Sequence, residues 1–159
     1  MLVARWDPRL RAHAWRLLGD PDQARDAVQQ GWVEIVRGLG RLQDEAAFAV
    51  WAYRIVSRRC SRAIGGARQR RRLAAALAAE PVSEPAEPPD VEALRAAVRA
   101  LPPEQRAAVA LYHYEELSIA ETAVALDVPA GTVKTRLMHA RRKLRGLLEG
   151  DETCRTSTS

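Results

Sequence analysis

Cationic side chains recur along residues 129–145 in a pattern that could read nucleic acid. Lysine and arginine donate hydrogen bonds to guanine and to phosphates, and methionine can contact the methyl group of thymine. Early residues of a recognition helix face base edges, so we expect the later cations to meet phosphates. The expected base-facing residues are Thr132, Lys134, Thr135, Arg136, Met138 and His139, and the expected phosphate-facing residues are Arg141, Arg142, Lys143 and Arg145.

A turn between two predicted helices would position these side chains. Ser118 and Glu121 have the spacing of a capping box, so a helix is expected to begin at Ser118. Asp127 tolerates turn geometry, and Pro129 suits the first turn of a second helix. The apolar residues of that second helix recur at helical spacing: Val133, Leu137, Ala140, Leu144 and Leu147. Cap, turn and basic face together favour a DNA-binding helix-turn-helix, and the alternative is a solvated basic helix that binds no ligand.

Arginines form a second cationic surface in the N-terminal half. A helix beginning at Asp44 or Glu45 is predicted there, because apolar residues recur at helical spacing: Phe48, Trp51, Ala52, Ile55 and Val56. The other side of this helix carries Arg54, Arg58, Arg59 and Arg62. Such a density of guanidinium groups beside an exposed loop favours a nucleic-acid backbone as the ligand, and a solvated surface is the alternative.

The elements around these two surfaces are also predicted to be helical. A first helix ends at Gly19-Asp20-Pro21, and a second helix runs over 22–38 from a cap at Asp22. The predicted inward residues of the second helix are Ala24, Ala27, Val28, Trp32, Ile35 and Val36. In the C-terminal half a helix over 91–100 ends at two prolines, and Pro103 opens the next helix. The predicted core residues there are Ala107, Val109, Ala110, Leu111 and Tyr114.

An acidic, proline-rich stretch over 80–90 separates the two halves and is typical of an extended, flexible linker. The expected fold class is therefore all-α, with two small helical domains joined by that linker. The predicted boundaries are an N-terminal domain over 1–72, a linker over 73–90, a C-terminal domain over 91–149 and a disordered tail over 150–159.

The net charge of +5 is unevenly distributed: +8 in residues 1–72, −3 in residues 73–103 and zero in residues 104–159. This distribution indicates a basic domain followed by an acidic connector. No apolar run reaches the ~18 residues of a membrane span, and charged residues interrupt the N-terminus. We therefore expect a cytoplasmic protein without membrane insertion.

Catalytic and metal chemistry is not indicated. Cys60 and Cys154 lie far apart without a CxxC pattern or a histidine at ligand spacing, so both are expected to be reduced thiols. The sequence shows no Ser-His-Asp set, paired carboxylates or phosphate-binding loop. We expect neither enzymatic activity nor a metal or other cofactor.

Two segments resemble a known family. The stretch Asp22–Val33, followed by Phe48–Cys60, resembles region 2 of bacterial sigma-70 factors. The stretch Leu101–Leu148 resembles region 4 of the same family. Helix-turn-helices are widespread, so either segment alone is only suggestive. Both segments in this order, with a short linker and no further domain between them, resemble the small extracytoplasmic-function (ECF) group.

The resemblance implies a role for each surface. The helix over 22–38 would dock on the β′ clamp helices of core RNA polymerase, and the C-terminal unit would meet the β flap. The loop before the third helix would capture a flipped base of the promoter −10 element, and the basic helix over 129–145 would bind the −35 element. The polymerase-facing residues would be Asp26, Gln29, Gln30, Val33 and Arg37, and the −10 residues would be Arg41, Gln43, Asp44, Arg54, Arg58, Arg59 and Arg62. An anti-sigma factor is a further expected partner.

Some positions depart from the family pattern. Gln30 stands where the family usually has an acidic residue, and Ala27 where a larger aliphatic residue is common. Both substitutions would weaken the polymerase contact or its specificity. The N-terminal segment is shorter than the first helix of the family, which leaves open whether Met1 is the natural start. Two interpretations of the linker remain: a simple tether, or a segment that threads toward the polymerase active centre.

Two other functions remain as alternatives. A one-component helix-turn-helix regulator, acting without polymerase docking, would bind duplex DNA tightly by itself, usually as a dimer on paired half-sites. A helical adaptor that binds only proteins would have no nucleic-acid function, and alanine at Lys134 and Arg136 would leave it unaffected. A sigma factor would bind DNA weakly alone and strongly together with core polymerase.

Overall fold

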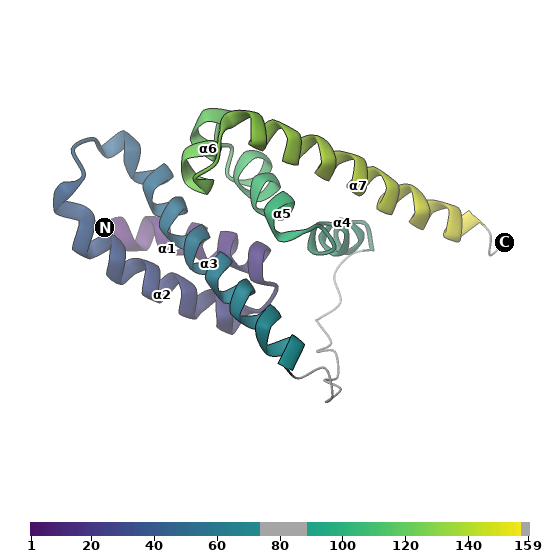
Figure 1. Ribbon diagram of the computed structural model, residues 1–159, viewed down its shortest axis with the longest axis horizontal. Coiled ribbons are helices and arrows are strands. Elements are labelled where there is room, and N and C mark those ends of the chain that lie inside the picture. The colour runs from purple at the N-terminus through teal and green to yellow at the C-terminus, as the bar shows by residue number, and fades with distance from the viewer. Residues whose placement is uncertain (74–88, 157–159) are drawn as a thin grey trace.

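The computed structural model describes residues 1–73 and 89–156, and within these ranges the chain is helical and contains no strand. The N-terminal unit comprises α1 (Leu2–Leu18), α2 (Pro21–Gly38) and α3 (Phe48–Leu73), which pack side by side (Figure 1). Two short 3₁₀ turns, Leu39–Arg41 and Glu45–Ala47, connect α2 to α3. The all-helical fold expected from the sequence is confirmed.

The turn between α1 and α2 is built by three consecutive residues. Gly19 adopts a left-handed φ of 73°, which glycine tolerates without steric cost. The carboxylate of Asp20 accepts hydrogen bonds from the backbone N–H groups of Asp22 and Gln23, at 2.8 and 3.3 Å. Pro21 occupies the first turn of α2, where its missing N–H is not needed. The cap is therefore Asp20, and the expectation of a cap at Asp22 was wrong.

The core of the N-terminal unit lies between the three helices. Its largest fully buried side chains include Leu10, Ile35, Tyr53, Val28 and Val56. The helices α2 and α3 approach closely at Gly31, where an added Cβ would lie 3.1 Å from a methyl group of Val56. Sequence periodicity placed Val36 in this core, but Val36 is 63% exposed. Val36 lies at the edge of the predicted stripe, one residue beyond the buried Ile35.

The C-terminal unit carries the helix-turn-helix. It comprises α4 (Pro89–Arg99), α5 (Pro103–Val109), a π-helical turn (Ala110–Tyr114), α6 (Ile119–Leu126) and α7 (Ala130–Thr156). Ser118 and Glu121 form the predicted capping box: the Ser118 hydroxyl accepts from the Glu121 N–H at 3.1 Å, and the Glu121 carboxylate accepts from the Ser118 N–H at 3.0 Å. The buried residues of this unit include Leu101, Val109, Ala123, Val133, Leu137 and Ala140.

Two expectations for the C-terminal unit differ from the structure. Tyr114 was expected in the core but is 39% exposed, because the π-helical turn rotates it toward the Arg16 guanidinium, 4.4 Å from its ring centre. The disordered tail was expected from residue 150, but α7 continues through Thr156. A lone glycine costs a helix only about 1 kcal/mol, so Gly150 does not end it. Most of the predicted linker over 73–90 and residues 157–159 lie outside the described residues.

The two units pack against each other. Four buried residues of the C-terminal unit (Ala110, Leu111, Leu117 and Ala125) belong to the same apolar cluster as the core of the N-terminal unit. In Figure 1, α5 and α6 lie over the α1–α3 layer, and α7 runs along the outer edge. The two helical domains expected from the sequence are therefore present, and they share one apolar cluster, while a second cluster lies within the C-terminal unit.

Candidate nucleic-acid interface

The turn of the helix-turn-helix is held by backbone geometry. Asp127 adopts a left-handed φ of 56°, which aspartate accepts more readily than most residues. The N–H of Val128 donates to the carbonyl of Ala123 at 3.1 Å, which closes the end of α6. At the start of α7 the hydroxyl of Thr135 donates to the carbonyl of Gly131 at 3.0 Å. These contacts fix the direction in which α7 leaves the turn.

The predicted recognition residues lie on the outer side of α7. Val133, Leu137 and Ala140 face the core, so the opposite face is presented to solvent. The exposed members are Lys134, Thr135, Met138, His139, Arg141, Arg142, Lys143 and Arg145. Thr132 and Arg136 are half-buried. An exposed helix face with cations along its length has the shape and charge of a major-groove contact.

The arginines of α3 are not free solvent cations. Arg58 and Arg59 both bind the carboxylate of Glu34 on α2, and the Arg59 Nη2–Oε2 distance is 3.0 Å. Arg54 lies 3.7 Å from the carboxylate of Asp127, in the turn before α7. Glu34 therefore fixes the positions of both guanidinium groups on the surface of α3. Glu34 was not predicted as a functional residue, although its helical position next to Val33 could have suggested a partner for the arginines.

A cavity of about 640 Å³ opens where α2, the 3₁₀ turn and α3 meet. Its lining brings together Arg41, Arg54 and Arg58 of the predicted −10 set, with the ring of Trp51 beside them. Trp51 is half-buried and lies against Gly38, where an added Cβ would approach the ring to 2.6 Å. Gln43 and Asp44 lie exposed on the adjoining loop, and the Asp44 carboxylate accepts from the Ala46 N–H at 2.9 Å. Aromatic and cationic groups around one opening can hold an unstacked base.

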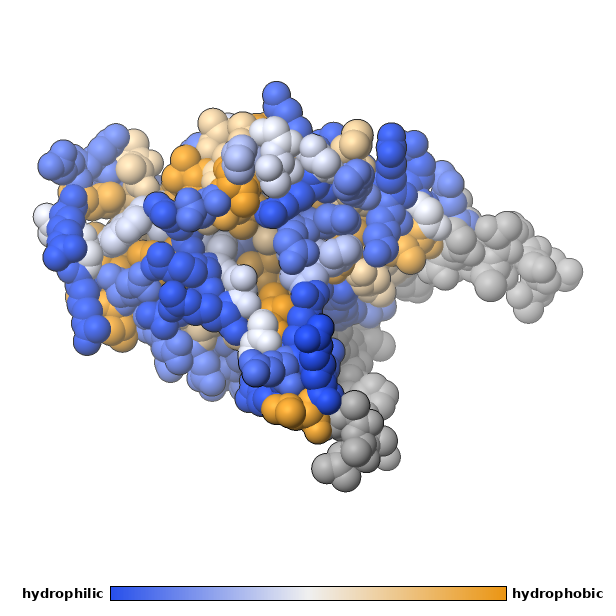
Figure 2. All heavy atoms as spheres, in the orientation of Figure 1, coloured by the Kyte–Doolittle hydropathy of each residue, from blue (hydrophilic) through white to orange (hydrophobic). Residues whose placement is uncertain are grey.

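A second cavity, of about 500 Å³, lies between the two units. Arg54, Arg58, Arg62 and Arg68 line it from α3, and Arg136 lines it from α7. Residues predicted for two separate DNA elements thus meet in one space. In Figure 2, hydrophilic residues surround a recess on the face shown.

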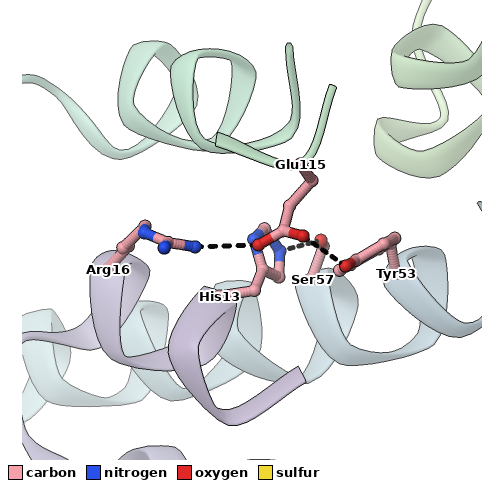
Figure 3. A network of polar contacts seen from close by, with 5 residues as sticks. All are labelled: His13, Arg16, Tyr53, Ser57 and Glu115. Carbon is pink, nitrogen blue, oxygen red and sulfur yellow. Dashed lines mark hydrogen bonds and ion pairs between the residues drawn. The ribbon is translucent and has the colours of Figure 1, made fainter. Parts of the chain in front are cut away.

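A network of polar contacts joins the units beside this cavity (Figure 3). The Glu115 carboxylate, from the C-terminal unit, lies between Arg16 on α1 and Tyr53 on α3. Next to it, the imidazole Nε2 of His13 lies 2.8 Å from the Ser57 hydroxyl. Burial, with a smaller effect of Arg16, lowers the pKa of His13 to about 3. None of these residues was predicted from the sequence, because the network joins positions far apart in the chain.

The predicted polymerase-facing residues share the outer face of α2. All five are exposed: Asp26, Gln29, Gln30, Val33 and Arg37. Val33 is 51% exposed, and the exposed Val36 and Leu39 extend this face. Exposed aliphatic side chains beside charged ones are typical of a surface that binds another protein.

Other chemistries find little support among the described residues. Within residues 1–73 and 89–149, no three histidine, cysteine or acidic side chains gather as a metal site would require. The Cys60 thiol is buried, which raises its pKa to about 12 and keeps it protonated. Within the described helices, none is long and apolar enough to cross a membrane.

Two family models match the chain. The one described as Sigma-70 region 2 matches residues 2–72, and the one described as Sigma-70, region 4 matches residues 91–144. Each match coincides with one of the two helical units. The gap between the matches contains the segment outside the described residues.

Individual proteins are similar over both units. The ECF RNA polymerase sigma factor SigE of Mycolicibacterium smegmatis is 32% identical, over 90% of this chain and 61% of the relative. The ECF RNA polymerase sigma factor SigM of Mycobacterium tuberculosis is 35% identical, over 80% of this chain and 65% of the relative. The chain thus spans less than two thirds of the length of these relatives. A solved structure, the sigma factor RpoE in complex with the anti-sigma factor NepR from Bartonella quintana, matches with a TM-score of 0.75 and 25% identity, over 92% of this chain and 94% of that one.

Proposed function

The chain belongs to the sigma-70 family, in its extracytoplasmic-function group, and from that membership we propose that it binds core RNA polymerase and directs transcription initiation at promoters. One observation carries the proposal: cationic faces on α3 and α7 occur together with an exposed, partly apolar face on α2. A one-component regulator needs a DNA-binding face and, usually, a dimer interface. A second cationic face around a base-sized cavity suits a protein that also opens the duplex.

Recognition of the −35 element is assigned to α7. Its early exposed residues, with Arg136 and Thr132, would meet base edges in the major groove. The later cations, Arg141, Arg142 and Lys143, would meet phosphates and set the register of the helix on the duplex. The exposure of this face supports the assignment.

Capture of the −10 element is assigned to the cavity beside Trp51. Strand opening requires a pocket for an unstacked base and cations along the displaced backbone. Arg41, Arg54 and Arg58 line this cavity, and Gln43 and Asp44 lie at its edge. Arg59 and Arg62, further along α3, would continue the contact with the backbone.

Docking on polymerase is assigned to α2, through Asp26, Gln29, Gln30, Val33 and Arg37, with the β′ clamp helices as the partner. The C-terminal unit would meet the β flap. The similar sigma factor of Bartonella quintana is bound to an anti-sigma factor, and we propose a partner of that kind for this chain. The protein would then act in the cytoplasm, by binding rather than by catalysis.

Transcription with purified components tests this function. Core polymerase with the full chain is expected to initiate at discrete sites on genomic DNA templates, and the free chain is expected to bind the same fragments weakly. Mapping the transcript starts would identify the promoters. Tight, dimeric duplex binding by the free chain, without any effect on core polymerase, would instead establish the one-component regulator.

Reversal of one charge on α2 tests the docking surface. Asp26→Arg is expected to abolish co-purification with core polymerase, because it replaces the carboxylate at the N-terminal end of the proposed contact face with a cation. Arg25→Glu is the matched control, since it reverses a charge about 100° around the same helix. Retained binding of Asp26→Arg, or equal loss in both variants, would refute this docking surface.

A further inference from the structure

A single carboxylate on α2 holds two neighbouring arginines of α3. Oε1 of Glu34 accepts a hydrogen bond from Nη2 of Arg58, and Oε2 accepts one from Nη2 of Arg59 at 3.0 Å. Both carboxylate oxygens are therefore engaged. The Glu34 side chain is 30% exposed, so it lies between the core and the solvent. The two arginines are thus anchored at one point on the surface of the N-terminal unit.

Glu34 also lines the cavity of about 640 Å³ to which capture of the −10 element is assigned. Of the described residues that line it, the charged ones are Glu34, Arg37, Arg41, Arg54 and Arg58. One anion therefore lies among four cations in a site proposed to bind a polyanion. Its charge repels a phosphate that approaches the same wall, which lowers the affinity for DNA. Attraction of DNA does not explain an acidic residue at this place.

The carboxylate occupies donors that a phosphate would use. A guanidinium binds carboxylate and phosphate oxygens through the same planar arrangement of N–H groups. A phosphate that binds Arg58 or Arg59 must therefore displace Glu34 or share its donors. This exchange replaces one anion by another, so a phosphate alone gains little net free energy from it.

A base that enters the cavity is not subject to the same exchange. The indole ring of Trp51 belongs to the lining, and stacking of a base on an aromatic ring does not require the occupied guanidinium groups. Glu34 thus weakens contacts with the DNA backbone and leaves stacking unaffected. The affinity difference between a strand that inserts a base and a strand that only touches the surface becomes larger.

We propose that Glu34 is a specificity-determining residue of the −10 surface: its carboxylate takes the place of a phosphate on Arg58 and Arg59, and so suppresses binding to DNA that inserts no base. This proposal rests on the proposed function, because it takes the cavity beside Trp51 to be a base-binding site. Glu34 acts through the two arginines and does not itself contact the base. The ligand that it disfavours is a nucleic-acid strand without the promoter sequence.

Glu34→Gln tests the contact with the least change in shape. The amide oxygen still accepts from one arginine, but the amide NH₂ group opposes the donors of the other arginine, which is released. One more phosphate contact adds about 0.7 to the slope of log affinity against log salt for single-stranded DNA. The full chain with Glu34→Gln is therefore expected to bind a non-promoter single strand about fivefold more tightly than the unaltered chain at about 0.1 M salt.

Asp22→Asn is the matched control. It changes the net charge by the same amount on the same helix, its side chain is 84% exposed, and its ion-pair partner is Arg25 of α2 itself. Fluorescence anisotropy with a short labelled strand, measured over a range of salt concentrations, compares both variants with the unaltered chain. Asp22→Asn is expected to leave the slope unchanged. An unchanged slope in Glu34→Gln, or equal changes in both variants, would overturn the proposal.

The two arginines provide a test of the mechanism. In a background of Arg58→Ala and Arg59→Ala, Glu34→Gln is expected to give no gain in affinity, because the donors that it releases are absent. A gain that persists in this background would show that Glu34 acts without these arginines and would refute the proposal. Thermal unfolding shows whether Glu34→Gln remains folded. If it does not, Glu34→Asp withdraws the carboxylate by one methylene group and carries the same expectations at a smaller size.

Transcription with core polymerase gives the second readout. Transcripts are compared between a mapped promoter and the same template with an altered −10 element. Glu34→Gln is expected to lower the ratio of the two about fivefold and to retain co-purification with core polymerase. Loss of co-purification would assign Glu34 to the docking surface and overturn the proposal.

This experiment also separates the inference from the proposed function. Normal initiation with an unchanged ratio in Glu34→Gln refutes the role of Glu34 alone. Absence of initiation with the unaltered chain refutes the sigma function, whereas the salt dependence of the free chain still decides whether Glu34 keeps Arg58 and Arg59 from the DNA backbone.

Discussion

The buried imidazole of His13 makes stability depend on pH in a defined direction. Its Nε2 is engaged with Ser57, its Nδ1 has no hydrogen-bond partner, and the ring packs against Tyr53 with 5.2 Å between centroids. Burial, and to a smaller extent the neighbouring Arg16 cation, disfavour the imidazolium, so the folded pKa of about 3 lies below the ordinary value of 6.5. His13 therefore stays neutral in the folded protein.

We predict that His13 destabilises the fold as the pH falls below 6.5. The unfolded chain binds a proton there that the folded chain excludes, so its contribution is complete above pH 6.5 and is lost progressively toward pH 3. The loss is at most about 1.4 kcal/mol per pH unit. Urea unfolding at pH 6.5 and 5.0 measures it. His13→Gln, which cannot titrate, should show a smaller difference between these two pH values, and an equal difference would contradict the assignment.

Arg136 and Lys143 test the division of α7 into base-facing and phosphate-facing residues. Arg136→Ala is expected to weaken binding to the cognate −35 sequence by about 1–3 kcal/mol and to relax the preference at one base pair. Lys143→Ala should weaken binding to all sequences alike and make it less dependent on salt. Promoter binding by the holoenzyme, compared over single base changes and salt concentrations, distinguishes the two. Unchanged output of Arg136→Ala on a mapped promoter would contradict the base contact.

At the level of elements, the crossing of α2 and α3 positions the proposed −10 surface. Glu34 on α2 holds Arg58 and Arg59 of α3, so the spacing of the two helices sets where these cations point. The crossing is close at Gly31, which is buried against Val56. A side chain at this position would force the helices apart.

We predict opposite effects for alanine at two helical glycines. Gly31→Ala should destabilise the protein by about 1–3 kcal/mol, because the added methyl group overpacks the crossing. The higher helix propensity of alanine offsets up to about 1 kcal/mol of that loss. Gly65→Ala, on α3, should stabilise it by about 0.5–1 kcal/mol, because nothing lies within 4 Å of the added Cβ. Chemical denaturation of both variants measures these changes. Stabilisation by Gly31→Ala would instead show that α2 and α3 can shift to accommodate the added methyl group without cost.

At the level of the whole molecule, the shared core predicts one cooperative unfolding transition. All four tryptophans (Trp6, Trp15, Trp32 and Trp51) lie in the N-terminal unit, so their fluorescence reports mainly on that unit, although Trp15 also contacts Arg95 of the C-terminal unit. Circular dichroism at 222 nm reports on the helices of both units. Because the C-terminal residues Leu111 and Leu117 complete the core of the N-terminal unit, the two thermal curves should coincide. Separate transitions would mean that the units unfold independently.

Local signals in the sequence were sufficient for most of the fold. The capping box at Ser118, the proline at 103 and the apolar stripe of α7 act within one or two turns of helix, and each predicted its element. Asp22 was predicted to cap α2, but the capping carboxylate lies two residues earlier, at Asp20. The paired roles of Glu34 and Glu115 depend on which helices lie side by side, and periodicity along one helix carries no such information.

The Glu115 contacts also make the N-terminal unit depend on the C-terminal half of the chain. Arg16 and Tyr53 both bind this carboxylate, and the apolar residues Leu111 and Leu117 complete the cluster around α1 and α3. A chain that ended at residue 73 would leave two polar groups without their partner and an apolar surface uncovered. We therefore expect such a fragment to associate with itself rather than to remain a monomer.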